Sequence, residues 1–139
     1  MLLGTFEHTL DAKGRLFLPA KWREELAPEV VVTAGLERCL LVMTKGRFED
    51  RAAQLEQLSP NHKASRDYSR LFFSSASEEP VDKSGRMSVP PTLRKYAALD
   101  KEVVMIGVSD RAEIWDRGAW AQYREAVESD FEAIAEQLD

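Results

Sequence analysis

Short apolar runs separated by polar turns dominate this chain, and they predict β-strands. Residues 30–34 and 40–43 are rich in β-branched and other apolar side chains, and the turn between them contains a glycine, which predicts a β-hairpin. Residues 103–108 and 112–115 predict a second hairpin of the same kind. The hydrophobic pattern therefore predicts one such hairpin in each half of the chain.

A turn motif near the N-terminus separates two further strand-like segments. Residues 3–10 and 16–18 flank Asp11-x-x-Gly14-Arg15. The glycine can supply the positive φ of a tight turn, and the aspartate can accept a hydrogen bond from the backbone two residues on. This arrangement predicts a short-stranded hairpin or a loop.

Apolar residues at helical spacing predict helices after the strand segments. Trp22 and Leu26 lie four residues apart directly after a proline that suits the first turn of a helix. Thr44 and Asp116 precede longer periodic segments and are the expected N-caps. A further helix is expected over residues 62–73, before the second half of the strand pattern begins.

The last segment of the chain predicts one continuous helix of about six turns. Its apolar residues recur every three or four positions: Trp120, Tyr123, Val127, Phe131, Ile134 and Leu138. A helix this long would extend beyond a small domain, so Phe131 and Ile134 are expected to contact another subunit. The alternative is that the whole stripe packs on the chain's own core.

One sequence motif occurs twice. DAKGRLFLPAKWREEL at 11–26 returns as DKSGRMSVPPTLRKYA at 82–97, and five aligned pairs are identical: Asp11/Asp82, Gly14/Gly85, Arg15/Arg86, Pro19/Pro90 and Arg23/Arg94. Such a repeat predicts two copies of one supersecondary unit that form a single pseudo-twofold α+β domain with a C-terminal helix. The expected boundaries are a first repeat at 1–61, a linking helix at 62–74 and a second repeat at 75–139.

The charge distribution makes nucleic acid a plausible ligand despite a formal net charge of −5. Residues 11–24 carry four cationic and two acidic side chains, and residues 82–95 carry four cationic and one acidic. The last twenty residues instead hold six acids against Arg124 alone. The repeats are therefore basic islands of the kind that neutralises phosphates, although solvated helix faces would give the same segregation.

Arg15 and Arg86 are the candidate base-reading residues, because the guanidinium fork matches a guanine edge or a phosphate and a two-stranded ribbon fits the major groove. The turns themselves are expected to be fixed by Asp11, Gly14, Asp82 and Gly85. Contacts to the DNA backbone are expected from Lys13, Lys21, Arg23, Lys83, Arg94 and Lys95. The alternative is that each Asp–Arg pair merely closes its turn and binds no ligand.

The doubled Asp-x-x-Gly-Arg-x-x-x-Pro motif, together with Phe72-Phe73-Ser74-x-Ala76 before the second copy, resembles the bacterial MraZ family over essentially the whole chain. One departure is that Lys83-Ser84 stands where the first copy has Ala12-Lys13. The resemblance implies two AbrB-like swapped-hairpin units in one chain, assembled into a ring-shaped homo-oligomer, with an octamer expected from the family.

The same resemblance implies function and location. Members of the family bind short direct repeats of double-stranded promoter DNA upstream of their own cell-division and cell-wall operon, and repression is the common outcome. The expected location is the cytoplasm, in association with the nucleoid. A competing interpretation is a ring-forming interaction protein whose basic faces hold an acidic protein partner, since arginine clusters serve both purposes.

The sequence offers little support for catalysis, a metal site or a cofactor. Its two histidines, His8 and His62, have no partner at metal-ligand spacing. The single Cys39 lies in an apolar run, so it cannot form a disulfide within the chain and is expected to be buried and inert. No uncharged apolar run approaches the roughly 20 residues of a membrane span. We therefore expect neither an enzyme nor a membrane protein, and no cofactor.

Overall fold

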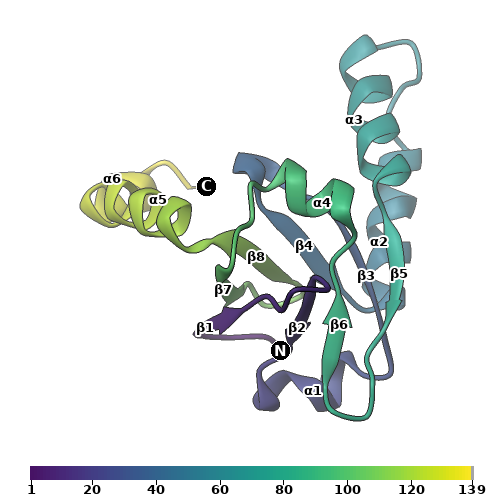
Figure 1. Cartoon of the computed structure of the whole chain (residues 1–139). Helices are drawn as coiled ribbons and strands as arrows, with labels where there is room; N and C mark the ends of the chain where they lie inside the picture. The colour runs from purple at the N-terminus through teal and green to yellow at the C-terminus, as the bar shows by residue number, and fades with distance from the viewer. Residues whose placement is uncertain (139) are drawn as a thin grey trace.

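The computed structural model describes residues 1–138, and its elements occur in the same order in both halves of the chain (Figure 1). The first half contains β1 (Thr5–Thr9), β2 (Arg15–Phe17), α1 (Ala20–Leu26), β3 (Glu29–Ala34), a 3-10 turn (Leu36–Arg38), β4 (Leu40–Met43) and α2 (Lys45–Glu56). After α3 (Lys63–Ser74) come β5 (Ser77–Pro80), β6 (Arg86–Ser88), α4 (Pro91–Tyr96), β7 (Glu102–Gly107), β8 (Ala112–Asp116), α5 (Arg117–Ser129) and α6 (Phe131–Glu136).

The strands of residues 1–138 form two sheets in which the two repeats are interlocked. A six-stranded sheet has the order β1-β7-β8-β4-β3-β5, and β2 pairs with β6 in a separate two-stranded ribbon. All pairings are antiparallel. The counterparts in the two repeats are β1 and β5, β3 and β7, and β4 and β8. If each strand is replaced by its counterpart, the same strand order is obtained when the sheet is read from its other edge. The fold therefore has the expected pseudo-twofold symmetry. Each repeat donates its first strand to the hairpin of the other.

Of the two alternatives for residues 3–10 and 16–18, the hairpin is wrong and the loop is confirmed, with a turn over residues 11–15. Thr5–Thr9 pairs with Glu102–Gly107, and Arg15–Phe17 pairs with Arg86–Ser88, so the strands on either side of the first turn belong to different sheets. Alternation along a strand reports that a segment is extended and half-buried, but it carries no information about the partner. The other two hairpins are confirmed as β3–β4 and β7–β8.

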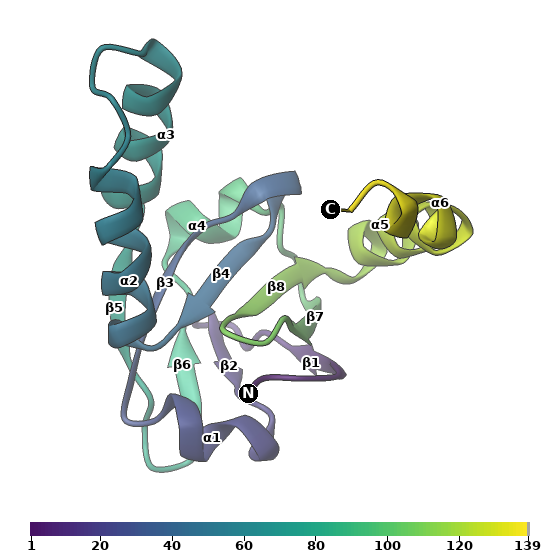
Figure 2. The ribbon, with the colours of Figure 1, turned by 180° about the vertical axis from the view of Figure 1, so that it is seen from behind.

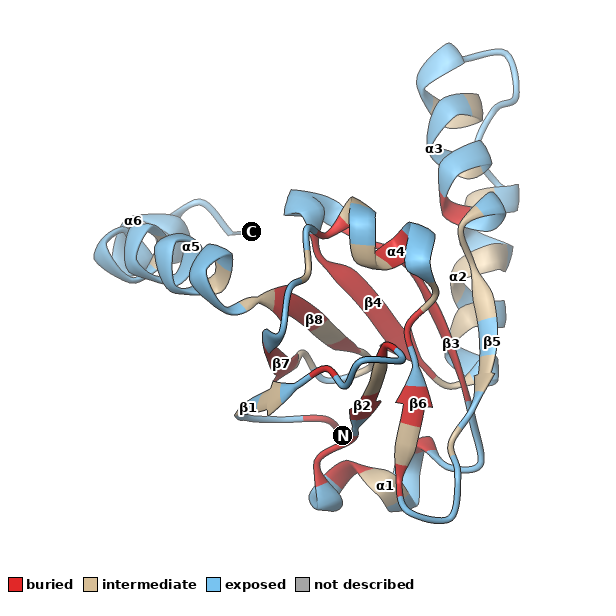
Figure 3. Ribbon diagram, viewed as in Figure 1, coloured by how far each residue is buried: buried red, intermediate tan, exposed pale blue. Residues whose placement is uncertain are grey.

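The central strands of the large sheet are buried (Figure 3), because apolar clusters lie on both of its faces, and this explains the near-continuous apolar runs of these strands. One face packs against the β2–β6 ribbon, α1 and α4, and Leu16, Met87 and Trp22 are buried there at 1–2% exposure. The other face holds a second cluster around Phe72 and Trp115, with α2, α3 and α5 packed against it. The ribbon is therefore anchored to a rigid core along one side only.

The helix ends were largely predictable. Thr44 caps α2 by accepting a hydrogen bond from the amide of Arg47 at 3.2 Å, and Asp116 caps α5 by accepting one from the amide of Ala119 at 3.0 Å. Both predicted N-caps are confirmed. The short helix with Trp22 and the helix before the second repeat are also present.

The single long C-terminal helix is wrong, because the segment breaks at Asp130. This residue has φ −104° and ψ 8°, and α6 begins directly after it. The hydroxyl of Ser129 donates to the carbonyl of Ala126 at 3.0 Å. Serine and aspartate compete with the helix for backbone hydrogen bonds, so the pair favours a helix end even where the apolar spacing continues.

The break divides the apolar stripe into two parts. Trp120 and Tyr123 pack against Trp115 with ring centroids 5.2 and 4.9 Å apart. Phe131 and Ile134, by contrast, are 67% and 38% exposed. The first part of the stripe thus packs at the edge of the chain's own second cluster, with Tyr123 still 37% exposed, and the second part makes no such contact within residues 1–138.

Cys39 is buried, as predicted, and its thiol donates to the carbonyl of Leu36. Burial raises the pKa of this thiol to about 12, so it stays protonated at neutral pH and is a poor nucleophile. Across residues 1–138, no helix has the length and apolar character needed to cross a membrane.

Candidate nucleic-acid interface

The first motif forms a turn that is tied together by one carboxylate. Oδ1 of Asp11 accepts hydrogen bonds from the amides of Lys13 and Arg15, both at 2.9 Å, and Oδ2 accepts from Nε of Arg15 at 2.7 Å. The amide of Arg15 is the main cause that lowers the pKa of Asp11, and its guanidinium and the amide of Lys13 add to the effect. The carboxylate is therefore ionised at neutral pH, when it holds both the backbone and the arginine.

The second motif reproduces this geometry at the other end of the ribbon. Asp82 accepts hydrogen bonds from the amides of Ser84 and Arg86 at 2.9 Å, and from Nε of Arg86 at 2.9 Å. The pKa of Asp82 is lowered, again chiefly by the amide of Arg86. Since Ser84 occupies the position of the first motif's lysine and donates through its backbone, the exchange of Lys83-Ser84 for Ala12-Lys13 leaves the turn intact.

Within the described part of the chain, the side chain of each arginine makes hydrogen bonds through Nε only. Within residues 1–138, the terminal amino groups of Arg15 and Arg86 make no hydrogen bond, and both side chains are about one-third exposed. The aspartate thus fixes one edge of the guanidinium and leaves the end with two amino groups able to donate to a ligand. These two amino groups are the pair of donors that matches the O6 and N7 acceptors of guanine.

Each turn rests on an arginine from the opposite repeat. Gly14 has φ +76°, and a Cβ there would lie 2.7 Å from Cζ of Arg94. Gly85 has φ +88°, and a Cβ there would lie 2.4 Å from Nε of Arg23. Glycine is required at both positions by conformation as well as by space.

Arg23 and Arg94, predicted to contact the DNA backbone, are half-buried in this arrangement. Nε of Arg23 donates to the carbonyl of Leu18 at 3.0 Å, whereas Nε of Arg94 is buried and has no hydrogen-bond partner among the described residues. Each guanidinium group lies against the glycine of a turn, so both side chains support the turns of the opposite repeat. The four predicted lysines, Lys13, Lys21, Lys83 and Lys95, are exposed.

Replacing Gly85 with alanine should test this support. We expect the substitution to destabilise the fold by about 1–3 kcal/mol, because it combines an unfavourable positive φ with a contact that displaces Arg23. Gly46 is a matched control, since it lies in α2 and a Cβ added there would have no neighbour within 4 Å. Gly46→Ala should leave stability unchanged or raise it by up to about 1 kcal/mol. Chemical denaturation measures both, and equal stability of the two variants would contradict the account.

The outer face of the β2–β6 ribbon joins the two arginines into one surface. Leu16 and Met87 face each other in the register and are buried, which leaves their neighbours on the opposite face. These neighbours are Arg15 opposite Ser88, and Phe17 opposite Arg86. Arg15 and Arg86 are diagonal neighbours in the register, a relation that places their Cα atoms roughly 7–8 Å apart.

Phe17 is the residue of this surface that sequence reasoning missed. It is 45% exposed, and the guanidinium carbons of Arg86 and Arg23 lie 5.8 and 6.0 Å from its ring centroid. Its position between two buried leucines in an alternating strand was the available signal, because alternation places it on the outer face.

No cluster of three or more histidine, cysteine, aspartate or glutamate side chains within residues 1–138 is arranged to hold a metal ion. The interface consists of two arginines, one aromatic ring and surrounding lysines. Such a set can donate hydrogen bonds and neutralise phosphates, which are the two requirements of a surface that binds DNA.

Comparison with known proteins gives one consistent result. A family model described as "MraZ protein, putative antitoxin-like" matches residues 1–71 and again residues 72–139. A protein of Salinispora arenicola named "Transcriptional regulator MraZ" is 53% identical over 136 residues, which span 98% of this chain and 96% of the relative. Proteins with the same name from Thermobifida fusca and a Thermoanaerobacter species are 50% and 44% identical, and each match spans at least 96% of both chains.

Proposed function

The chain belongs to the MraZ family and is a DNA-binding transcriptional regulator, and from this premise we propose that the outer face of the β2–β6 ribbon is its base-reading surface. The observation that carries the proposal is the pair of identical turns, in which an aspartate holds Nε of an arginine and leaves its terminal amino groups unengaged. We assign the chain no catalytic role, since its relatives bear the name of a regulator.

In this mechanism the ribbon enters the major groove and each arginine donates two hydrogen bonds to a guanine. The ionised aspartate restricts the rotamers of the arginine before binding, so less side-chain entropy is lost on contact. The roughly 7–8 Å between the two Cα atoms corresponds to about two base-pair steps of 3.4 Å. One ribbon would therefore read a box of only a few base pairs.

The lysines around the ribbon would contact phosphates and set the affinity without reading sequence. Lys13 and Lys83 lie in the two turns, whereas Lys21 lies on α1 and Lys95 on α4. All four are exposed. Their positions beside the ribbon support a role on the DNA strands that border the groove.

A short box cannot by itself give high affinity, so the proposal includes an oligomer and repeated boxes. We propose that the boxes are direct repeats in the promoter of the chain's own cell-division and cell-wall operon, where binding represses transcription. The protein would accordingly be cytoplasmic and associated with the nucleoid. The proposal also divides the chain into a first repeat at 1–61, a linking helix at 62–74 and a second repeat at 75–139.

The oligomer is proposed to form by head-to-tail contact between copies, up to a closed ring such as an octamer. Figures 1 and 2 show α2–α3 and α5–α6 projecting from opposite ends of the sheet, so the two ends of one copy are separated. A contact between unlike surfaces repeats from copy to copy and gives a ring when the rotation closes.

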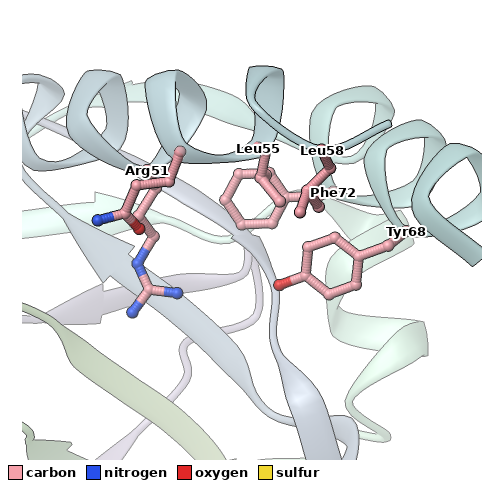
Figure 4. A pocket seen from close by; sticks show the side chains of 6 residues that line it. Arg51, Leu55, Leu58, Tyr68 and Phe72 are labelled. Carbon is pink, nitrogen blue, oxygen red and sulfur yellow. The ribbon is translucent and has the colours of Figure 1, made fainter. Parts of the chain in front are cut away.

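The two ends have complementary chemistry. Between α2 and α3 lies an apolar hollow of about 360 Å³ lined by Leu55, Leu58, Tyr68 and Phe72, with Arg51 at its side (Figure 4). The positive charge beside this hollow comes from Arg51, because Lys63, Arg66 and Arg70 lie on the face of α3 opposite to Tyr68 and Phe72. The opposite end presents the exposed Phe131 and Ile134 within the acidic C-terminal segment. An acidic segment with apolar anchors suits an apolar hollow that has a cation at its side.

The number of boxes on the DNA should control affinity. If one ring presents several equivalent ribbons, DNA with two or four boxes should bind at least tenfold more tightly than DNA with one box, through effective concentration rather than better contacts. Anisotropy titrations over a salt series measure this, and the logarithm of the binding constant should fall linearly with the logarithm of the salt concentration. Equal affinity for one, two and four boxes would contradict the repeated-ribbon proposal. Failure to bind any upstream DNA at low salt would favour an interaction protein.

A further inference from the structure

The two halves of the ribbon's outer face differ at one position. Arg15 and Arg86 are equivalent under the pseudo-twofold symmetry, but Phe17 corresponds to Ser88. The register places the phenylalanine directly opposite Arg86 and the serine directly opposite Arg15. One arginine therefore has an aromatic ring beside it and the other has a small hydroxyl.

Phe17 is held at the surface by its surroundings and is not a displaced core residue. Its neighbours Leu16 and Leu18 are buried at 1% and 0% exposure, and they anchor the strand on the core side. The ring remains 45% exposed on the outer face, and the guanidinium carbons of Arg86 and Arg23 lie 5.8 and 6.0 Å from its centroid. The exposed part of the ring is therefore available for an apolar contact beside the two arginines of the ribbon.

We propose that Phe17 is a specificity-determining residue that packs against the C5-methyl group of a thymine next to the base read by Arg86. The inference rests on the proposed function of the ribbon. In the major groove the thymine methyl is the one apolar group on a base edge, and phenylalanine is among the side chains that contact it. Because Ser88 cannot make this contact beside Arg15, the ribbon distinguishes the two directions of its box.

The test removes one methyl group from the DNA at a time. Replacing each thymine of the bound box by deoxyuridine deletes the methyl and leaves base pairing unchanged. One such replacement should weaken binding of the unmodified protein about three- to fivefold, which is the effect expected from burial of one methyl group. All other replacements should change affinity less than twofold.

Protein variants assign the effect to Phe17. Phe17→Ser places the residue of the other repeat at this position and should bind thymine and uracil boxes equally, whereas Phe17→Leu should keep part of the preference. Gly46→Ala, in α2 on the other side of the large sheet, is the control and should keep the full preference. Circular dichroism shows whether each variant is folded. If Phe17→Ser does not fold, the reduced preference of Phe17→Leu for thymine provides the test.

The outcomes separate the inference from its premise. Specific binding by the unmodified protein that is insensitive to every uracil replacement overturns the role of Phe17 and leaves the ribbon proposal standing. A uracil effect that persists in folded Phe17→Ser also overturns it. If Phe17→Ser without DNA forms an assembly of lower mass than the unmodified protein, the Phe17 side chain is a subunit contact. That result would also overturn its proposed role in reading thymine. Absence of any sequence-specific binding would overturn both.

Discussion

Alanine at Arg15 is expected to reduce affinity for the specific DNA box by about 1–3 kcal/mol, or roughly 5- to 150-fold. The reason is the loss of a bidentate contact to a base edge by a guanidinium that Asp11 already holds in position. Arg86→Ala should have an effect of the same size, because its turn has the same hydrogen bonds. The double variant should bind the specific box no better than scrambled DNA.

The control for this prediction is Lys21→Ala. Lys21 is exposed on α1 beside the ribbon, and its counterpart in the other repeat is Thr92. If it contacts phosphate, its loss should weaken binding to specific and scrambled duplexes alike and reduce the salt slope by about one contact. Anisotropy titrations of the variants on both duplexes measure all of these effects. A folded Arg15→Ala variant that binds the specific box like the parent would show that this arginine does not read the sequence.

Aspartate at both Phe131 and Ile134 is expected to dissociate the assembly into single chains. The two side chains are exposed in one copy and are proposed to fill the hollow between α2 and α3 of the next. Two carboxylates placed in an apolar hollow would be desolvated without partners, and the loss of an interface anchor alone costs about 2 kcal/mol or more. Light scattering should show the mass of a monomer, with an unchanged circular dichroism spectrum.

Ala133→Asp is the matched control for that variant. This residue lies on the opposite side of the same short helix, between Glu132 and Ile134, and is also exposed. It adds a charge to α6 without placing it in the proposed contact, so the assembly should keep its mass. An unchanged mass for the folded double variant would mean that the tail does not hold the copies together.

The parts of the fold that the sequence predicted are those determined by interactions between residues close together in the sequence. The β3–β4 and β7–β8 hairpins follow from apolar runs on either side of a short turn, and Thr44 and Asp116 are recognisable as caps from their position alone. The doubled motif also predicted the pseudo-twofold symmetry, because two similar segments are expected to fold alike.

The parts that could not be predicted depend on contacts between distant residues. Thr5–Thr9 and Arg15–Phe17 are adjacent in sequence, yet each pairs with a strand of the other repeat. The same holds for Arg23 and Arg94, whose roles beneath Gly85 and Gly14 arise only when the repeats interlock. Basic residues in a basic segment look alike in the sequence, whether they face solvent or support a turn.

The C-terminal segment shows where a strong periodic signal is insufficient. The spacing of apolar residues continues through Asp130, but the backbone leaves the helix there. Hydrophobic periodicity reports one face of a helix and does not register competition for backbone hydrogen bonds, which Ser129 demonstrates by bonding to Ala126. Phe131 and Ile134, which follow the break, are exposed, and their contact with another subunit stays a prediction.

The most direct test of the central claim is binding to upstream DNA in which single guanines are replaced by 7-deazaguanine, which lacks the N7 acceptor in the major groove. We predict that two positions within one box, about two base-pair steps apart, each lower the affinity of the unmodified protein at least fivefold. Arg15→Ala should become insensitive at one position and Arg86→Ala at the other. If the unmodified protein binds every substituted box with the affinity of the parent DNA, the ribbon's arginines do not read guanine and the account is contradicted.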